Sequence, residues 1–253
     1  MNPEYNPEYI ASIQSDSDRI VSALASSPDA AIPWCGDWTV KDCAHHVGAL
    51  HHVVAAVIKG RPTANFGLFK TLDPPPATDP ALGPWIAAGT ATLVEELRTA
   101  YIDEPCWTFW SEVPTVAFWS RRSAHETAVH RWDVERAAGV DIDPMDPVIA
   151  ADGVDEFLDV FVGMMRGLHA TPGAGETVHV HCTDTAGEWL LTLPDTGTRT
   201  LTREHAKGDV AFRGPAEGLL LYLWGRLPAD AAGVEIVGDA AFAATWRDLV
   251  PAI

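Results

Sequence analysis

Four long segments with helical apolar spacing fill the first 140 residues, and this pattern stops at Asp146-Pro147. In each segment apolar residues recur mostly at intervals of three and four, which is typical of amphipathic helices. Four such helices favour a bundle, a fold that commonly holds a ligand or metal between its helices. We expect the helices at residues 4–26, 39–59, 81–101 and 116–138.

Local signals mark the ends of these helices. Thr39 is a candidate N-cap, with Asp42 three residues later as its acidic partner. Gly139 is typical of the residue that closes a helix. Residues 61–80 carry the run Pro74-Pro75-Pro76, which predicts an irregular, extended connection.

The second half has short alternating segments that are typical of strands, separated by turn residues. The sequence therefore predicts an α+β protein: a helical bundle at 1–146 and a small α+β domain at 147–253. In the second domain we expect helices at 148–168, 219–224 and 240–249, and strands near 178–182, 189–193, 199–203, 209–213 and 234–237.

Charge and cysteine content exclude several classes of function. The 253 residues include 17 Lys and Arg and 35 Asp and Glu, a net charge of −18. This acidity argues against nucleic acid and anionic membrane surfaces as partners. No apolar run reaches the roughly 18–20 residues that span a bilayer, and the first residues lack the features of a signal peptide. Four scattered cysteines favour a reducing, cytoplasmic location.

Histidines gather in the second predicted helix, in the run AHHVGALHH. At about 100° per residue, His46 and His51 lie at opposite edges of the apolar arc, and His45 and His52 face solvent. Periodicity alone does not choose between His46 and His51 as a residue that looks into the bundle.

The fourth predicted helix carries HETAVHRWDVE. Glu126 and His130 are four residues apart and share a face, and Arg122 and Asp133 lie close to that face. Burying these groups together is costly unless they pair with one another or bind a metal. The residues leave both interpretations open: a structural network or a metal site.

Two weaker patterns favour structural roles. His179 and His181 share one face of a predicted strand, and we expect that face to be exposed to solvent. Cys43 is expected to be a small core residue. No Gly-rich nucleotide motif or acyl-serine motif occurs.

Two motifs in order, WTVKDCAHHVGALH and HETAVHRWDVERAAG, resemble the mycothiol-dependent maleylpyruvate isomerase family, whose N-terminal part is similar to DinB-like metal-binding four-helix bundles. The segments GEWLLTLP, LLLYLWGRLPAD and VGDAAFAATW resemble the family's C-terminal α+β domain. His45 is an extra histidine relative to the family pattern, and the 60–80 loop has no counterpart in its signature.

The resemblance implies that His46, Glu126 and His130 hold a divalent metal, with His51 as a further candidate. Two imidazoles and one carboxylate leave a coordination position open, as in a catalytic zinc site, although other divalent metals fit the same ligands. The family's co-substrate is mycothiol. Its thiolate would add to the cis double bond of a small acidic substrate, and its loss after bond rotation would give the trans product.

Three further residues are candidates around this site, Arg122 and Asp133 from their position on the fourth helix and Arg226 from the family resemblance. Arg122 and Arg226 are expected to bind substrate carboxylates, a task that suits the planar guanidinium group. Asp133 is expected to orient His130 or Arg122. Two alternatives stay open: a zinc hydrolase that uses metal-bound water, and a metal-binding module without catalysis.

Overall fold

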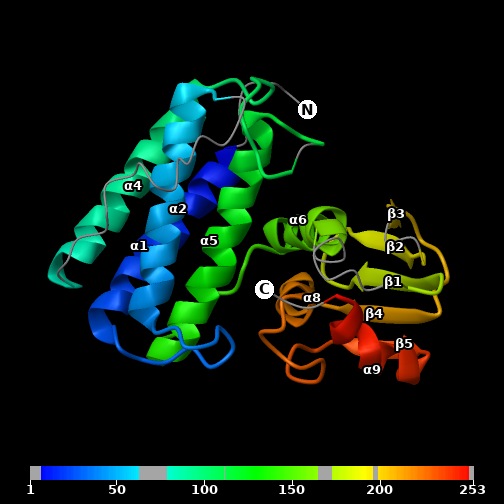
Figure 1. The fold of residues 1–253 in the computed structure, drawn as a ribbon. Helices are drawn as coiled ribbons and strands as arrows, with labels where there is room; N and C mark the ends of the chain where they lie inside the picture. The colour runs from blue at the N-terminus through cyan, green and yellow to red at the C-terminus, as the bar shows by residue number, and fades with distance from the viewer. Residues whose placement is uncertain (1–6, 63–78, 111, 165–172, 196–198, 251–253) are drawn as a thin grey trace. The chain divides into compact units, whose positions relative to one another are not determined.

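The computed structural model describes residues 7–62, 79–110, 112–164, 173–195 and 199–250, and it divides into two units, Met1–Asp143 and Pro144–Ile253 (Figure 1). The expected proline-rich connection at 74–76 and the end of the helix expected over 148–168 lie outside the described residues. Within the described ranges, no helix has both the length and the apolar character needed to cross a membrane.

The first unit is a bundle of four long helices, as predicted (Figure 1). α1 packs mainly against α5 and α2 mainly against α4, and the pairs α1–α4 and α2–α5 also pack together. The helices have the following bounds: α1 Pro7–Ser26, α2 Val40–Gly60, α4 Asp79–Thr99 and α5 Val116–Ala138.

The two predicted helix caps, at Thr39 and Gly139, are confirmed. The Thr39 hydroxyl accepts a hydrogen bond from the Asp42 backbone N–H, and the Asp42 carboxylate accepts one from the Thr39 N–H at 2.9 Å. This reciprocal pair fixes the start of α2. α5 ends at Gly139, whose φ of 68° is a left-handed conformation that glycine adopts without steric cost.

The second unit is an α+β domain with a five-stranded sheet in the order β3-β2-β1-β4-β5. β1 and β4 are parallel, and the other neighbouring pairs are antiparallel. The strands have the following bounds: β1 Glu176–Cys182, β2 Glu188–Leu193, β3 Thr200–Thr202, β4 Val210–Gly214 and β5 Glu235–Gly238.

Helices cover one face of this sheet. α6 (Pro147–Glu156) continues into a π-helical segment at Phe157–Phe161, and α8 (Ala216–Leu223) and α9 (Ala240–Leu249) follow the strands. The Phe212 ring of β4 contacts Tyr222 of α8 at 5.2 Å and Trp246 of α9 at 5.5 Å, measured between ring centroids. Alternate residues of β1, among them His179 and His181, therefore face the opposite side of the sheet.

α4 lies close to α2 at Gly48 but not at Gly60. Replacing each glycine by alanine should therefore affect the free energy of unfolding differently at these two positions. A Cβ on Gly48 would lie 2.7 Å from the Trp85 ring and 2.8 Å from a buried carbon of Ile86, whereas a Cβ on Gly60 would meet only Pro62, at 3.7 Å. We expect Gly48→Ala to lower the free energy of unfolding by about 1–3 kcal/mol through overpacking. Gly60→Ala should leave it unchanged or raise it by up to about 1 kcal/mol, because alanine favours helix.

Urea unfolding of the two variants, followed by far-ultraviolet circular dichroism, measures both effects. Equal stability of the Gly48→Ala variant and the wild-type protein would show that α2 and α4 do not approach this closely.

Candidate metal centre

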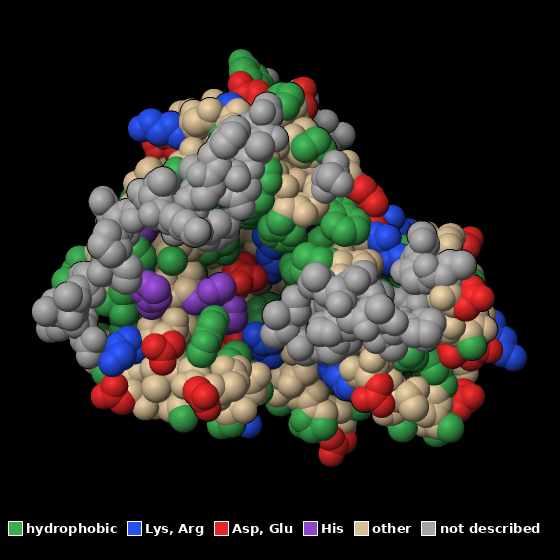
Figure 2. All heavy atoms as spheres, viewed as in Figure 1, with side chains coloured by type: hydrophobic (Ala, Val, Ile, Leu, Met, Phe, Trp, Pro, Cys, Tyr) green, Lys and Arg blue, Asp and Glu red, His purple; other side chains and the backbone are tan. Residues whose placement is uncertain are grey.

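Two neighbouring helices supply the side chains of the candidate site. α2 contributes His46, and α5 contributes Glu126 and His130, which follow each other by one helical turn. Figure 2 shows histidine side chains at the surface of the bundle beside an acidic side chain. The His46 side chain is 39% exposed and that of Glu126 is 22% exposed, so the site lies at a wall of the bundle that solvent reaches.

The two imidazoles converge on one carboxylate oxygen. His46 Nε2 lies 2.8 Å from Glu126 Oε1, and His130 Nε2 lies 3.3 Å from the same oxygen. One donor atom from each of the three residues lies within 4.8 Å of the others. These nitrogen and oxygen donors suit zinc and related divalent metals, so the residues fit the metal that the resemblance implies.

The second ring nitrogen of His130 is also bound. His130 Nδ1 lies 2.9 Å from Asp133 Oδ2, and the Trp34 indole N–H donates to the other Asp133 oxygen at 2.6 Å. Asp133 is fully buried. Metal-binding histidines commonly bond a carboxylate through the nitrogen that does not bind the metal. Asp133 is therefore placed to orient His130 with its Nε2 atom toward Glu126.

Cys43 approaches His130 on the same side as Asp133. Its Sγ atom lies 3.4 Å from His130 Nδ1, and Cys43, His130 and Asp133 form a second, fully buried group of donors. The hydrogen bond between Nδ1 and Asp133 occupies the ring nitrogen that this group would need. We therefore take the half-exposed group of His46, Glu126 and His130 as the candidate centre.

Paired charges keep Glu126 ionised despite its burial. Burial raises the pKa of its carboxyl group, but the Arg122 guanidinium, with hydrogen bonds from His130 and His46, holds that pKa well below the usual value. Arg122 Nη2 donates to Glu126 Oε2 at 2.8 Å. The pairing of Arg122 with Glu126 that a structural network predicts is thus present, and it leaves Oε1 facing the two imidazoles.

His130 carries the opposite shift. Burial lowers the pKa of its imidazole, but Cys43, Asp133 and Glu126 together raise it well above the usual value. This shift favours the protonated imidazole. A divalent metal at this site would compete with that proton, since ligating imidazoles are neutral.

His51 lies away from this group. It is fully buried, and its two ring nitrogens lie 3.0 Å from the Thr90 hydroxyl and 2.9 Å from the Thr127 hydroxyl. Both nitrogens are thus used for hydrogen bonds that join α2 to α4 and α5. The structure places His46, and not His51, beside Glu126 and His130.

The expectation that His45 and His52 face solvent is wrong. Both are half-buried against Trp85 of α4: the His45 ring stacks on it at 5.6 Å, and His52 Nε2 lies 3.1 Å from its backbone oxygen. A long aromatic side chain on the neighbouring helix covers positions that helical periodicity alone assigns to the exterior.

Residues 131–133 have three different surroundings. Arg131 is buried and forms ion pairs with Asp16 of α1 at 3.0 Å and with Glu135 at 2.7 Å. Trp132 packs on Trp34, with ring centroids 5.4 Å apart. Of these three residues, only Asp133 contacts the candidate centre, through His130. Arg131 and Trp132 instead fix α5 against the elements that precede it.

Trp38 is a further neighbour of the centre, which the candidate residues taken from the sequence did not include. Its ring centroid lies 5.0 Å from that of His46 and 6.0 Å from that of His130. Trp38 also lines a surface hollow of roughly 450 Å³ together with His45 and His46. The sequence position of Trp38 could have predicted this contact, because Trp38 directly precedes the N-cap of the helix that carries the histidines.

Arg226 belongs to the other unit. It is buried after the end of α8, where its Nη1 atom donates to the Trp224 carbonyl at 2.9 Å and its guanidinium lies 5.9 Å from the Trp224 ring centroid. Its expected role in substrate binding stays a prediction.

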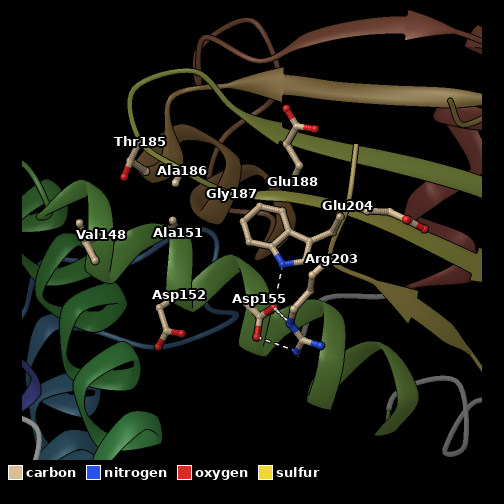
Figure 3. Close-up of a pocket in the computed structure, with 11 residues that line it drawn as sticks. Val148, Ala151, Asp152, Asp155, Thr185, Ala186, Gly187, Glu188, Arg203 and Glu204 are labelled. Carbon is tan, nitrogen blue, oxygen red and sulfur yellow. Dashed lines mark hydrogen bonds and ion pairs between the residues drawn. The ribbon is translucent and has the colours of Figure 1, made fainter. Parts of the chain in front are cut away.

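A larger surface pocket in the second unit lies between α6, the β1–β2 turn and the end of β3 (Figure 3). Asp155 accepts hydrogen bonds there from the Trp189 indole at 2.7 Å and from Arg203 at 2.6 and 3.0 Å. These charged groups hold the walls of the pocket together, so we do not take it as the primary site.

The buried, uncharged state of His51 predicts a pH-dependent contribution to stability. Burial, followed by weaker effects of His52 and His46, lowers its pKa from 6.5 to about 3, although Glu126 opposes this shift. Between these values the unfolded chain binds a proton that the folded chain does not, so stability falls as pH decreases.

We expect His51→Gln to reduce this pH dependence by up to about 1.4 kcal/mol per pH unit between roughly pH 6 and 4. Urea unfolding of both proteins across this range gives the difference curve. A difference that stays constant with pH would contradict the neutral assignment of His51.

Comparison with family models matches both units of the chain. The mycothiol maleylpyruvate isomerase N-terminal domain matches residues 10–135, and the C-terminal domain of the same family matches residues 148–245. No curated protein and no solved structure gives a significant match.

Proposed function

Because the chain belongs to the mycothiol maleylpyruvate isomerase family, we propose that it is a metal-dependent enzyme that uses a low-molecular-weight thiol on a small acidic substrate. The thiol is mycothiol, and the reaction is a cis–trans isomerisation or a transfer of the thiol. The observation that carries this proposal is the convergence of His46 Nε2 and His130 Nε2 on Glu126 Oε1.

The three donor residues would hold the metal, and zinc suits them best. A bound divalent metal with an open position supplies a deprotonated thiol at neutral pH. Three protein donors and a partly exposed His46 are consistent with such an open position.

The other residues of the centre fix the donors. Arg122 neutralises Glu126 and restrains one of its oxygens. Asp133 holds the His130 ring in one orientation, and Trp34 in turn holds Asp133. Donors fixed in this way do not need to reorganise when a ligand binds, which favours a catalytic over an adaptable site.

The isomerisation itself needs no net addition of atoms. The thiolate sulfur adds to one carbon of the substrate double bond, and the electron pair moves into the adjacent carbonyl group. Rotation follows about the bond that is now single, and the returning electron pair expels the thiolate. A cation is needed for the substrate carboxylates, and we assign this role to Arg122 and, from the family resemblance, to Arg226.

Two neighbouring histidines of α2 provide a matched test of the metal ligands. We expect His46→Ala to lower the zinc content by one ion per chain, because it removes one of three donors. His45→Ala should keep the wild-type content, since His45 stacks on Trp85 outside the donor group.

Elemental analysis after zinc loading and dialysis measures both variants, with circular dichroism as the control for folding. Equal zinc content in the two variants would exclude His46 as a ligand.

Thiol dependence tests the proposed reaction. Zinc-loaded protein should isomerise maleylpyruvate only when mycothiol is present, and His46→Ala should lower the rate by about two orders of magnitude or more, because the metal contributes several kcal/mol. The absorbance of the substrate reports the conversion. Hydrolysis of esters or amides without any thiol would instead support a hydrolase that uses metal-bound water. A zinc-loaded protein without either activity would support a binding module.

A further inference from the structure

Three histidines and one glutamate meet on the face of the sheet that α8 and α9 do not cover. His179 and His181 come from β1, Glu188 from β2, and His205 from the segment that follows β3. One donor atom from each residue lies within 4.8 Å of the others. We call these four residues the sheet cluster.

Strand register explains how β1 and β2 bring three of them together. His181 is directly opposite Glu188 in the antiparallel β1–β2 pair, and His179 lies two residues earlier on the same face. His181 Nδ1 lies 2.5 Å from Glu188 Oε1, and His179 Nε2 lies 3.7 Å from Glu188 Oε2.

The order of the strands explains the fourth member. β3 pairs with β2 at one edge, but the next strand, β4, pairs with β1, so residues 203–209 must pass β2 and β1. His205 lies on this crossover, with its Nδ1 atom 2.6 Å from Glu188 Oε2 and its ring 5.3 Å from that of His179. The crossover ends at Asp209, whose carboxylate accepts hydrogen bonds from Thr177 of β1.

Burial of His179 corrects the expectation that this face of β1 is open to solvent. His179 is only 8% exposed, and its Nε2 atom is buried without a hydrogen-bond partner among the described residues. An unpaired buried nitrogen costs roughly 1–3 kcal/mol, so such atoms usually have a partner.

The Glu188 carboxylate is directed away from the neighbouring pocket. The Trp189 indole donates a hydrogen bond to Asp155. In Figure 3 the Glu188 carboxylate lies on the opposite side of the sheet from Asp155. This follows from strand alternation, since Glu188 and Trp189 are consecutive. Glu188 is therefore available to the three histidines and not to the Asp155 network.

We propose that the sheet cluster is a second metal site, which binds one zinc ion or a similar divalent transition metal. Three imidazole nitrogens and a carboxylate oxygen are zinc ligands, and four protein donors complete a tetrahedral site. A closed site of this kind is structural: it would join the 203–209 crossover to β1 and β2. The acidic chain, with net charge −18, adds a favourable field for a cation.

Zinc titration of the His46→Ala protein tests the sheet cluster without the bundle centre. We expect one zinc ion to bind per chain and to shift the nuclear magnetic resonance signals of His179, His181 and His205. His205→Ala and Glu188→Gln should each weaken binding by about tenfold or more. The His205 side chain is 79% exposed, so its removal leaves the fold intact.

Glu204→Gln is the matched control, because Glu204 is an exposed neighbour of His205 outside the cluster. It should bind zinc as tightly as its parent. Zinc should also slow proteolysis within residues 203–209 in the parent and in this control, but not in the His205→Ala protein. Zinc that leaves all three histidine signals unchanged, or binding that is equal in the His205→Ala and Glu204→Gln proteins, would overturn the proposal. Neither result would bear on the bundle centre.

Discussion

The Glu126 carboxylate is the interaction on which the candidate centre depends. One of its oxygens accepts a hydrogen bond from Arg122, and the other faces the Nε2 atoms of His46 and His130. A carboxylate in this position needs compensation, because removing one partner from a buried charge pair costs roughly 3–5 kcal/mol. On one side of the carboxylate, the Arg122 guanidinium supplies the compensating positive charge. The other side presents the Nε2 atoms of two imidazoles, which the proposed metal would bind.

The family resemblance identified the whole group, whereas helical spacing, a local property, predicted only part of it. Glu126 and His130 share a face at any packing of α5, and the Thr39–Asp42 cap sets the start of α2 independently of other helices. The choice between His46 and His51 was not local. Both lie at edges of the same apolar arc, and the difference arises only because the hydroxyls of Thr90 and Thr127 surround one of them. Side chains from α4 and α5 thus determine that His46, and not His51, lies beside Glu126 and His130.

The same limit applies to the residues that support the centre. Trp34 lies about a hundred positions from Asp133, and nothing in the spacing of either residue predicts their hydrogen bond. In the second unit, the alternation of β1 correctly placed His179 and His181 on one face, but solvent exposure of that face was wrong for His179. The exposure of His179 depends on strand order. Because β2 and β1 lie between β3 and β4, the segment that joins β3 to β4 passes over the face that carries His179.

The two groups of donors differ in the way that separates catalytic from structural metal sites. The bundle centre has three donors, and its buried His130 is held from behind by a carboxylate. The sheet cluster has four donors, namely three imidazoles and one carboxylate, and two of the imidazoles lie within 2.6 Å of the carboxylate. Rigid support with a vacant position favours exchange of an external ligand, whereas a complete donor set excludes it. The proposed thiol would therefore bind at the first group, whereas the proposed second metal would join the crossover to the sheet.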